Sequence, residues 1–291
     1  MKPAKFDYYK PNTLNEALSL LEELGENGKI IAGGQSLVPI MNMRLATPEA
    51  LIDINNLEDL HYIKKEDSMI KIGALTRQRI VETSDIIREN CGLLADSIPH
   101  IGHVQTRNRG TIGGSLVHAD PTAELPLALL ALKGTLHISS SDEVRVVEAE
   151  DFFITYLTTD MMPNEILTEI QIPIMEGRVG YAFAEIARRH GDFGIVAAAC
   201  VMTIDDNENL ESIRLTLGGV EAIPLLVEEA EEILKGEKVT DSLLEQITEA
   251  VVDVIDPESD LHASAEYRTH LAKILTKRVI NEAYSKAKGV I

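Results

Sequence analysis

The sequence predicts an α+β fold made of more than one globular unit. Short strand patterns alternate with helical patterns in the first half, whereas three longer strand patterns and then two amphipathic helices fill the last third. The chain has 291 residues, which fits about two domains at roughly 150 residues each. Hydrophobic residues make up 45% of the chain, which is enough to bury a core and excludes wholesale disorder.

The first part begins with a helix and continues through three short strands. Thr13 and Glu16 form a Thr-x-x-Glu capping box, apolar residues follow at helical spacing, and Gly25 ends the helix. The strands are predicted at residues 29–32, 51–54 and 69–72. Residues 75–87 are predicted to form a single helix after the third strand.

The middle of the chain is rich in glycine and arginine. Residues 98–116 contain four glycines and two arginines without any repeat, so we expect an ordered loop system there. The elements predicted after it are a helix at 125–132, a hairpin with strands at 134–138 and 144–147, and an alternating strand at 166–172.

The last third combines a small antiparallel sheet with helices. Pro173, Gly177 and Gly180 interrupt the pattern, which places a domain boundary near residues 174–178. Strands are predicted beyond it at 181–187, 195–204 and 210–217, and helices at 242–254 and 264–286. Together with a division near Asn55, this predicts three units that cover residues 1–55, 56–176 and 177–291.

The charge and the cysteines restrict the classes of partner. With 47 acidic and 27 basic residues the formal net charge is −20, which repels phosphate backbones and anionic lipid, so we expect no nucleic-acid partner. Cys91 and Cys200 are too few to hold an iron–sulfur cluster and are typical of buried thiols in a reducing cytoplasm. Residues 1–10 are polar and no apolar run is long enough to span a membrane, so we expect a cytoplasmic protein without a signal peptide or membrane span.

Two glycine pairs are the strongest candidates for ligand binding. The first lies in Ala32-Gly33-Gly34-Gln35-Ser36 and the second in Thr111-Ile112-Gly113-Gly114-Ser115. Adjacent glycines take positive φ and let a ligand approach the backbone, and successive N–H groups in such a turn bind anions. Two such loops, with Arg107 and Arg109 beside the second, predict a grip on both phosphates of a diphosphate. The alternative is two tight turns without a ligand. Neither loop fits the Rossmann fingerprint or the P-loop.

Four segments resemble the FAD subunits and domains of molybdenum hydroxylases, such as those of aerobic carbon monoxide dehydrogenase, nicotinate dehydrogenase and xanthine dehydrogenase. Residues 31–39 with Arg44 resemble the first flavin-binding motif of this family. Residues 107–115, followed by Ala119-Asp120-Pro121 and Glu124, resemble the second and most specific motif. The segments 188–193 and 266–268 are similar to parts of the C-terminal domain, so the resemblance covers essentially the whole chain.

The resemblance implies a fold, a cofactor and a set of contact residues. The fold is the vanillyl-alcohol-oxidase-type (PCMH) FAD-binding fold of two subdomains, followed by a C-terminal α/β domain with a three-stranded antiparallel sheet and helices. The cofactor is FAD. The residues implied to hold it are Ala32, Gly33, Gly34, Gln35, Ser36 and Leu37 in the first motif, Thr111, Ile112, Gly113, Gly114 and Ser115 in the second, and Ile101, Glu124, Ile166, Leu167, Asp192 and Phe193 elsewhere.

The sequence departs from the family pattern at two places. Position 115 is often Asn in the family and is Ser115 here, which shortens the hydrogen-bonding side chain. Some members carry a lysine at the position of Ala184 or Glu185, and this chain has none there.

We expect neither a metal site nor a catalytic residue in this chain. His100 and His103 form a His-x-x-His pair, but the sequence offers no further ligands beside them. Asp192, beside His190, fits a position next to a flavin edge, with a surface turn as the alternative. Phe193 is a candidate to stack on the flavin ring, with a core position as the alternative.

The function implied by the resemblance is electron transfer within a larger complex. A molybdopterin large subunit oxidises the substrate, [2Fe–2S] centres of a small subunit pass the electrons to FAD in this chain, and FAD passes them to NAD⁺, a quinone or another acceptor. Because this chain lacks the cysteines for the clusters, those partners must be separate polypeptides in a heterotrimer. The alternatives are a stand-alone FAD-dependent reductase or oxidase of the same fold and a non-catalytic nucleotide-binding scaffold.

Overall fold

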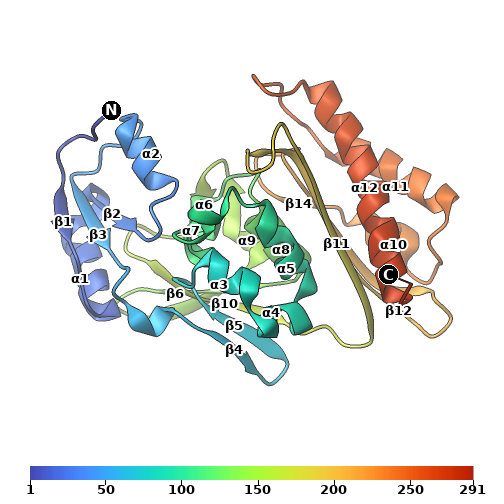
Figure 1. The fold of residues 1–291 in the computed structure, drawn as a ribbon, viewed down its shortest axis with the longest axis horizontal. Helices are drawn as coiled ribbons and strands as arrows, with labels where there is room; N and C mark the ends of the chain where they lie inside the picture. Colours follow the sequence, from blue (N-terminus) through green and yellow to red (C-terminus); the bar gives the residue numbers. More distant parts are fainter. Residues whose placement is uncertain (291) are drawn as a thin grey trace.

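The computed structural model describes residues 1–290, which form four separate β-sheets. Figure 1 shows them spread along the long axis of the molecule. The N-terminal sheet lies at one end with α1 and α2, the five-stranded sheet and the helices α3–α8 occupy the centre, and the last sheet lies toward the other end under α11 and α12. No helix within residues 1–290 is long and apolar enough to cross a membrane.

The N-terminal sheet is parallel and has the strand order β1-β3-β2. Its strands are β1 (Asp7–Tyr9), β2 (Gly28–Ile31) and β3 (Ala50–Asp53), and its helices are α1 (Leu14–Leu24) and α2 (Leu37–Asn42). Thr13 caps α1 by accepting the N–H of Glu16, and Gly25 ends the helix, so this predicted helix is confirmed. The helix α2, which begins directly after the first glycine motif, was not predicted.

The central sheet is antiparallel and has the order β4-β5-β10-β6-β7. Its strands are β4 (Ile63–Glu66), β5 (Met69–Gly73), β10 (Ile166–Pro173), β6 (Thr135–Ser139) and β7 (Val144–Glu148). The small hairpin of β8 (Phe153–Thr155) and β9 (Thr158–Thr159) follows β7. The strands and the hairpin predicted in this part of the chain are confirmed.

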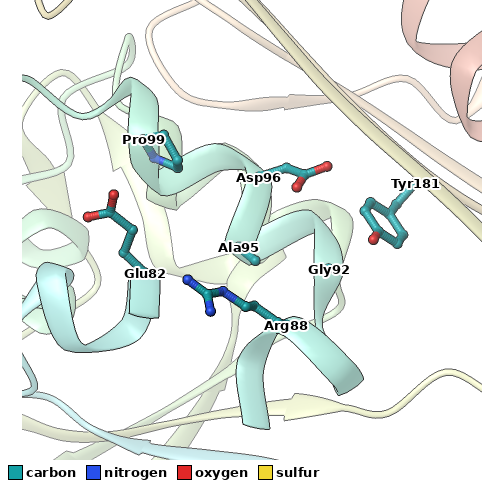
Figure 2. Close-up of a pocket in the computed structure, with 7 residues that line it drawn as sticks. All are labelled: Glu82, Arg88, Gly92, Ala95, Asp96, Pro99 and Tyr181. Carbon is teal, nitrogen blue, oxygen red and sulfur yellow. The ribbon is translucent and has the colours of Figure 1, made fainter. Parts of the chain in front are cut away.

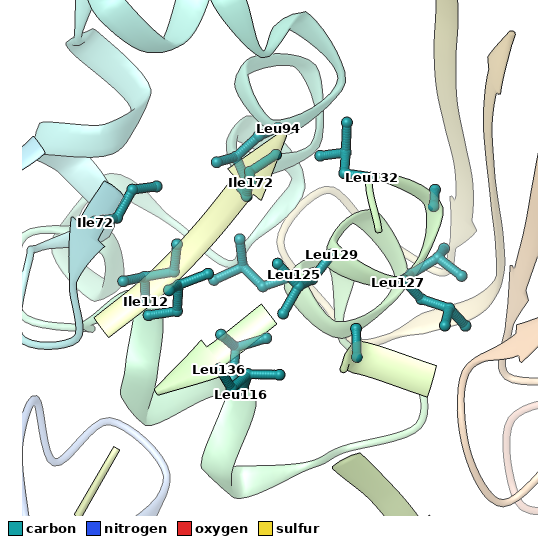
Figure 3. Packing of buried hydrophobic residues seen from close by; sticks show 14 of the residues in the cluster. Ile72, Leu94, Ile112, Leu116, Leu125, Leu127, Leu129, Leu132, Leu136 and Ile172 are labelled. Atoms are coloured by element: carbon teal, nitrogen blue, oxygen red, sulfur yellow. The ribbon is translucent and has the colours of Figure 1, made fainter. Parts of the chain in front are cut away.

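The helices in the centre of the molecule lie between the central sheet and the last sheet. They are α3 (Gln78–Thr83), α4 (Asp85–Asn90), α5 (Gly92–Ser97), α6 (Val104–Arg107), α7 (Ile112–His118), α8 (Glu124–Ala131) and α9 (Ala149–Phe152). Figure 3 shows Leu125 and Leu129 of α8 among Ile112, Leu116 and Leu136. All eight residues of α8 are buried, because α5 and α7 lie on one side of this helix and β12 and β13 on the other.

Two predictions for this region are wrong. The predicted helix 75–87 is two short helices, because Ser84 has an extended backbone and its side chain caps α4 by accepting the N–H of Ile87. The predicted loop system 98–116 contains α6 and α7. Thr111 caps α7, so the second glycine pair lies in the first turn of a helix and not in a loop.

The last sheet is antiparallel and has four strands, where three were predicted. They are β11 (Arg178–Ala187), β12 (Gly194–Ile204), β13 (Leu210–Gly218) and β14 (Leu225–Leu226). The fourth strand has only two residues, too few to show any alternation in the sequence. The helices α10 (Glu229–Leu234), α11 (Asp241–Val254) and α12 (Ala265–Ala287) complete this part. The core formed by α12 includes Ala182 and Ala184 of β11, whereas the core shared with α8 includes Phe183, from the opposite face of that strand.

The contact between β11 and α12 leaves no room for a side chain at Gly180. A Cβ there would overlap the carbonyl oxygen of Ala283, a backbone atom that moves only with its helix. We therefore expect Gly180→Ala to destabilise the protein by about 1–3 kcal/mol, measured as a lower midpoint of urea unfolding. The comparison variant is Gly177→Ala, where the space is open and only the strain of φ 87° opposes the change, at about 1 kcal/mol. An equal or smaller loss for Gly180→Ala would contradict this packing.

Candidate functional site

The two glycine segments lie in direct contact, although almost 80 residues separate them. A Cβ on Gly33 would overlap the carbonyl oxygen of Arg109 and lie 2.8 Å from the Cα of Gly110. A Cβ on Gly114 would lie 3.9 Å from the Cβ of Ala32. The bare backbone of Gly33 is therefore needed for this close packing, whereas the distance at Gly114 is an ordinary contact. Positive φ, which the sequence suggested for all four glycines, occurs only at Gly34, where φ is 70°.

A cavity of about 380 Å³ opens beside this contact. Residues 31–35 form one wall together with Val38 and Pro39. Asp53 at the end of β3, Asn55 just after it, and Arg109 line the rest of the cavity. The cavity therefore lies at the carboxyl ends of parallel strands, where α/β proteins commonly bind ligands.

The two segments differ in the backbone N–H groups that they leave free. The N–H groups of residues 33–36 donate to no protein atom within residues 1–290. In the second segment, the N–H of Ile112 donates to Thr76 O at 3.0 Å, that of Gly113 to Ala74 O at 2.9 Å, and that of Gly114 to Thr111 Oγ1 at 3.1 Å. The expectation of two N–H nests is thus wrong for the second segment, because Thr111 and the chain after β5 take up its donors. The first segment keeps its consecutive N–H groups free, and such groups are typical of anion-binding turns.

A polar network that the sequence analysis missed joins the two segments. Asn55 Nδ2 donates to Ala32 O at 2.8 Å and to Asp53 Oδ1 at 2.6 Å. Arg77 donates to Asn55 Oδ1 at 2.7 Å and also to Arg109 O, so it joins the chain after β3 to the chain just before the second glycine segment. The sequence Asp53-Ile54-Asn55 places polar residues at the carboxyl end of a strand, and this pattern could have indicated that Asn55 belongs to the site. No local pattern marks Arg77.

The two arginines near the second segment have different roles. Arg109 lines the cavity. Arg107 is only 8% exposed and does not reach the cavity, because its Nε bonds Glu82 at 2.9 Å. Its Nη1 donates to the carbonyl oxygens of Pro99, Ile101 and Gly102. Arg107 therefore holds the chain before α6 in place and is not part of the nest.

The predicted residues Ile101, Asp192 and Phe193 lie in a second region. Ile101 is buried, and the loop between β11 and β12 packs on the residues after it, since a Cβ on Gly191 would lie 2.6 Å from the ring of His103. Asp192 is exposed in a turn closed by its N–H and Arg189 O. Phe193 is 76% exposed, so the alternative of a core position for this ring is wrong.

The remaining predicted residues are buried. Glu124 is the first residue of α8 and is 8% exposed. Burial and the negative charge of Glu185 raise the pKa of Glu124 to about 8, and burial raises the pKa of Glu185 to about 7. Ile166 packs in the N-terminal core and Leu167 in the central core, so neither side chain lines the cavity.

Other candidates from the sequence form no site. Among residues 1–290, no group of three or more His, Cys, Asp or Glu side chains is arranged to hold a metal ion. Cys91 and Cys200 are buried, which raises the pKa of both thiols, that of Cys91 to about 12. Figure 2 shows a second cavity, of about 330 Å³, between α4, α5 and Tyr181 of β11. The two carboxylates that line this cavity already form ion pairs within the chain, Glu82 with Arg107 and Asp96 with Lys286.

Two family descriptions match nearly the whole chain. Residues 4–175 match the family described as the FAD binding domain in molybdopterin dehydrogenase. Residues 181–283 match the family described as the CO dehydrogenase flavoprotein C-terminal domain. Among curated proteins, the 6-hydroxypseudooxynicotine dehydrogenase complex subunit alpha of Paenarthrobacter nicotinovorans is 38% identical, over 99% of this chain and 97% of that protein. The carbon monoxide dehydrogenase medium chain of Hydrogenophaga pseudoflava is 34% identical, over 98% and 99%.

Solved structures are similar along the whole chain as well. The carbon monoxide dehydrogenase of Hydrogenophaga pseudoflava that lacks the Mo-pyranopterin moiety of its cofactor has a chain with a TM-score of 0.96 and 34% identity, which covers 98% of this chain and 99% of that chain. A chain of quinoline 2-oxidoreductase from Pseudomonas putida 86 has a TM-score of 0.93 and 34% identity, with 100% and 99% covered.

Proposed function

The chain belongs to the family of FAD-binding subunits of molybdopterin dehydrogenases, and from this we propose that it is an electron-transfer subunit of a molybdenum hydroxylase. In this proposal it takes electrons from [2Fe–2S] centres of a partner subunit and passes them to NAD⁺, a quinone or another acceptor. When bound, FAD supplies the redox chemistry, since it exchanges electrons singly or in pairs. The chain binds and orients FAD and supplies the charged groups around it.

The observation that carries the proposal is the free N–H nest beside the cavity. A chain with a net charge of −20 repels a diphosphate at long range, so the cofactor must be held by local donors. Residues 33–36 offer consecutive N–H groups with no protein partner, and Arg109 lines the same cavity. These residues fit the diphosphate of FAD.

We assign the predicted contact residues to two parts of the cofactor. Residues 32–37 would hold the diphosphate, and residues 111–115 would form the facing wall with the exposed backbone of Gly114 and the hydroxyl of Ser115. Ile101, Glu124, Asp192 and Phe193 would lie nearer the flavin ring. Ile166 and Leu167 would contribute through their backbone, since their side chains are buried in the cores.

The assembly and the domain division are part of the same proposal. The two cysteines are buried and far too few for clusters, which supports a separate [2Fe–2S] small subunit beside a molybdopterin large subunit. The free thiols also support a cytoplasmic location. Three sheets, at residues 7–53, 63–173 and 178–226, support a vanillyl-alcohol-oxidase-type FAD fold in units 1–55 and 56–176 and a C-terminal unit 177–291.

The test is flavin binding and reduction by the purified chain. We expect the chain reconstituted with FAD to absorb at about 450 nm and to release FAD on denaturation. We also expect its flavin to be reduced by a reduced [2Fe–2S] partner but not by an organic substrate alone. A chain that holds no flavin would refute the proposal. Rapid bleaching by substrate without any partner would favour the stand-alone reductase instead.

A further inference from the structure

The carbonyl groups of the first glycine segment are held in place by the rest of the protein. The oxygens of residues 31–34 accept, in this order, Ile54 N at 3.2 Å, Asn55 Nδ2 at 2.8 Å, Gln35 Nε2 at 3.1 Å and Val38 N at 3.1 Å. The C=O and the N–H of a planar trans peptide unit point in opposite directions. Each held carbonyl therefore turns the N–H of the next residue away from the donor that holds it. The N–H groups of residues 33–35 are among those that donate to no protein atom within residues 1–290, and the same residues line the cavity.

Asn55 supplies the one hydrogen bond of this set that depends on a partly buried side chain. The bonds from Ile54 and Val38 come from backbone N–H groups, beside the β2–β3 pair and at the start of α2. Gln35 is exposed, so water can replace its side chain at little cost. Asn55 is partly buried, and it sets the direction of the N–H of Gly33.

The side-chain amide of Asn55 is itself fixed in one orientation. Arg77 donates to Asn55 Oδ1 at 2.7 Å, so the Nδ2 atom faces Ala32 O. The second hydrogen of Nδ2 goes to Asp53 Oδ1 at 2.6 Å, and the N–H of Asn55 donates to the same oxygen at 2.9 Å. The other oxygen of Asp53 accepts the hydroxyl of Tyr8. A rotated amide would turn its oxygen toward two acceptors and its NH₂ group toward a guanidinium, which carries only donors.

We propose that Asn55 is a positioning residue for FAD, because it holds the peptide unit between Ala32 and Gly33 with its N–H available to the diphosphate. Glycine restricts the backbone very little, so this peptide unit can rotate once the bond to Ala32 O is lost. The rotated unit presents a carbonyl oxygen to the anion instead of an N–H. A donor that is already oriented also avoids the entropy cost of being ordered on binding. The inference rests on the proposed function, since it concerns the site assigned to the diphosphate.

The first test is the Kd of FAD for variants of Asn55, measured from the quenching of flavin fluorescence. We expect Asn55→Ala to raise the Kd about tenfold or more, the effect of losing one hydrogen bond to an anion. Asn55→Asp keeps the shape but turns an acceptor toward Ala32 O, and it should bind FAD more weakly still. The matched control is Asn56→Asp, which adds the same charge at a side chain that faces Asn12 and is not part of the cavity lining. We expect its Kd to stay within about threefold of the wild-type value.

The second test separates positioning from a purely structural role. Wild type and Asn55→Ala, both with ¹⁵N-labelled glycine, are titrated with inorganic pyrophosphate, and the amide resonances of Gly33 and Gly34 are followed. In wild type both resonances should move. In Asn55→Ala the Gly33 resonance should move less than half as far, whereas Gly34 keeps its shift because its direction depends on Gly33 O. A purely structural role would lower the unfolding temperature and leave the ratio of the two shifts unchanged.

The outcomes distinguish this inference from the proposed function. If wild type binds FAD and Asn55→Ala binds it equally well, the positioning role is refuted and the proposed function stands. If wild type binds pyrophosphate through Gly33 and Gly34 but does not bind FAD, the proposed function is refuted, and the shift of Gly33 in Asn55→Ala still decides on the positioning role. A wild-type chain that binds neither ligand would refute both.

Discussion

A Gly114→Asp variant is expected to bind FAD at least about 30-fold more weakly than the wild-type chain. Gly114 is exposed in the first turn of α7, and a Cβ there would point to within 3.9 Å of Ala32, beside the free N–H nest. A carboxylate at this place would face the cofactor diphosphate across a partly desolvated cavity. Repulsion between unit charges at about 4 Å is about 4 kcal/mol at an effective dielectric constant near 20.

The matched control is Gly114→Asn, which has the same shape without the charge. Both side chains meet Thr111 Oγ1, which lies 2.7 Å from the position of the new Cβ, so both disturb the cap of α7 equally. Flavin titration of the two variants then separates charge from size. Equal Kd values for Gly114→Asp and Gly114→Asn would contradict the proposal that the diphosphate lies beside Gly114. If both variants bound FAD with wild-type affinity, residues 111–115 would not be part of the binding site.

The sequence identified the glycine segments but not how each of them works. Hydrogen-bond donors count as a binding site only if the rest of the protein leaves them free. The N–H groups of residues 33–36 remain free because the chain turns away from β3 after Ile31. Those of Ile112 and Gly113 donate to residues that follow β5, a contact that no local pattern reveals. The glycines also argued against a helix at 112–118, because glycine costs about 1 kcal/mol per residue there.

The division of the predicted helix 75–87 into two helices also shows that local sequence patterns do not give every helix boundary. Residues 75–87 have continuous helical periodicity, yet Ser84 begins a new helix, since its hydroxyl offers a cap that competes with the continuing helix. In contrast, α12 and the long strands β11 and β12 were predicted within a few residues, because their apolar spacing extends over many turns or pleats. A strand of two residues such as β14 is too short to show such repeated apolar spacing.

The network that holds the site together depends on contacts between segments distant in sequence. Arg77 joins Asn55 to Arg109, which lie 54 residues apart, and none of the three has a spacing that predicts the others. Arg107 shows the opposite case. Its position beside the glycine motif suggested contact with the diphosphate, whereas tertiary packing buries it against Glu82.

An Arg107→Ala variant is expected to lose about 3–5 kcal/mol of unfolding free energy, measured by urea unfolding. The substitution leaves the half-buried Glu82 without its main partner and three carbonyl oxygens without their donor. Arg79→Ala is the control, because Arg79 also contacts Glu82, at 3.0 Å, but its side chain is 44% exposed, and solvent-exposed pairs contribute less than about 1 kcal/mol. A similar loss in both variants would contradict a special role of Arg107.

The pH dependence of this loss identifies the ion pair as its cause. The guanidinium groups of Arg107 and Arg79 hold the pKa of Glu82 below its ordinary value despite burial. A lowered carboxyl pKa contributes stability above the ordinary value of 4.5, and this stability is lost as the pH falls through the folded pKa. The gap between wild type and Arg107→Ala should therefore narrow toward acid pH. A gap that stays constant from neutral to acid pH would assign the loss to the three carbonyl contacts, because these do not titrate.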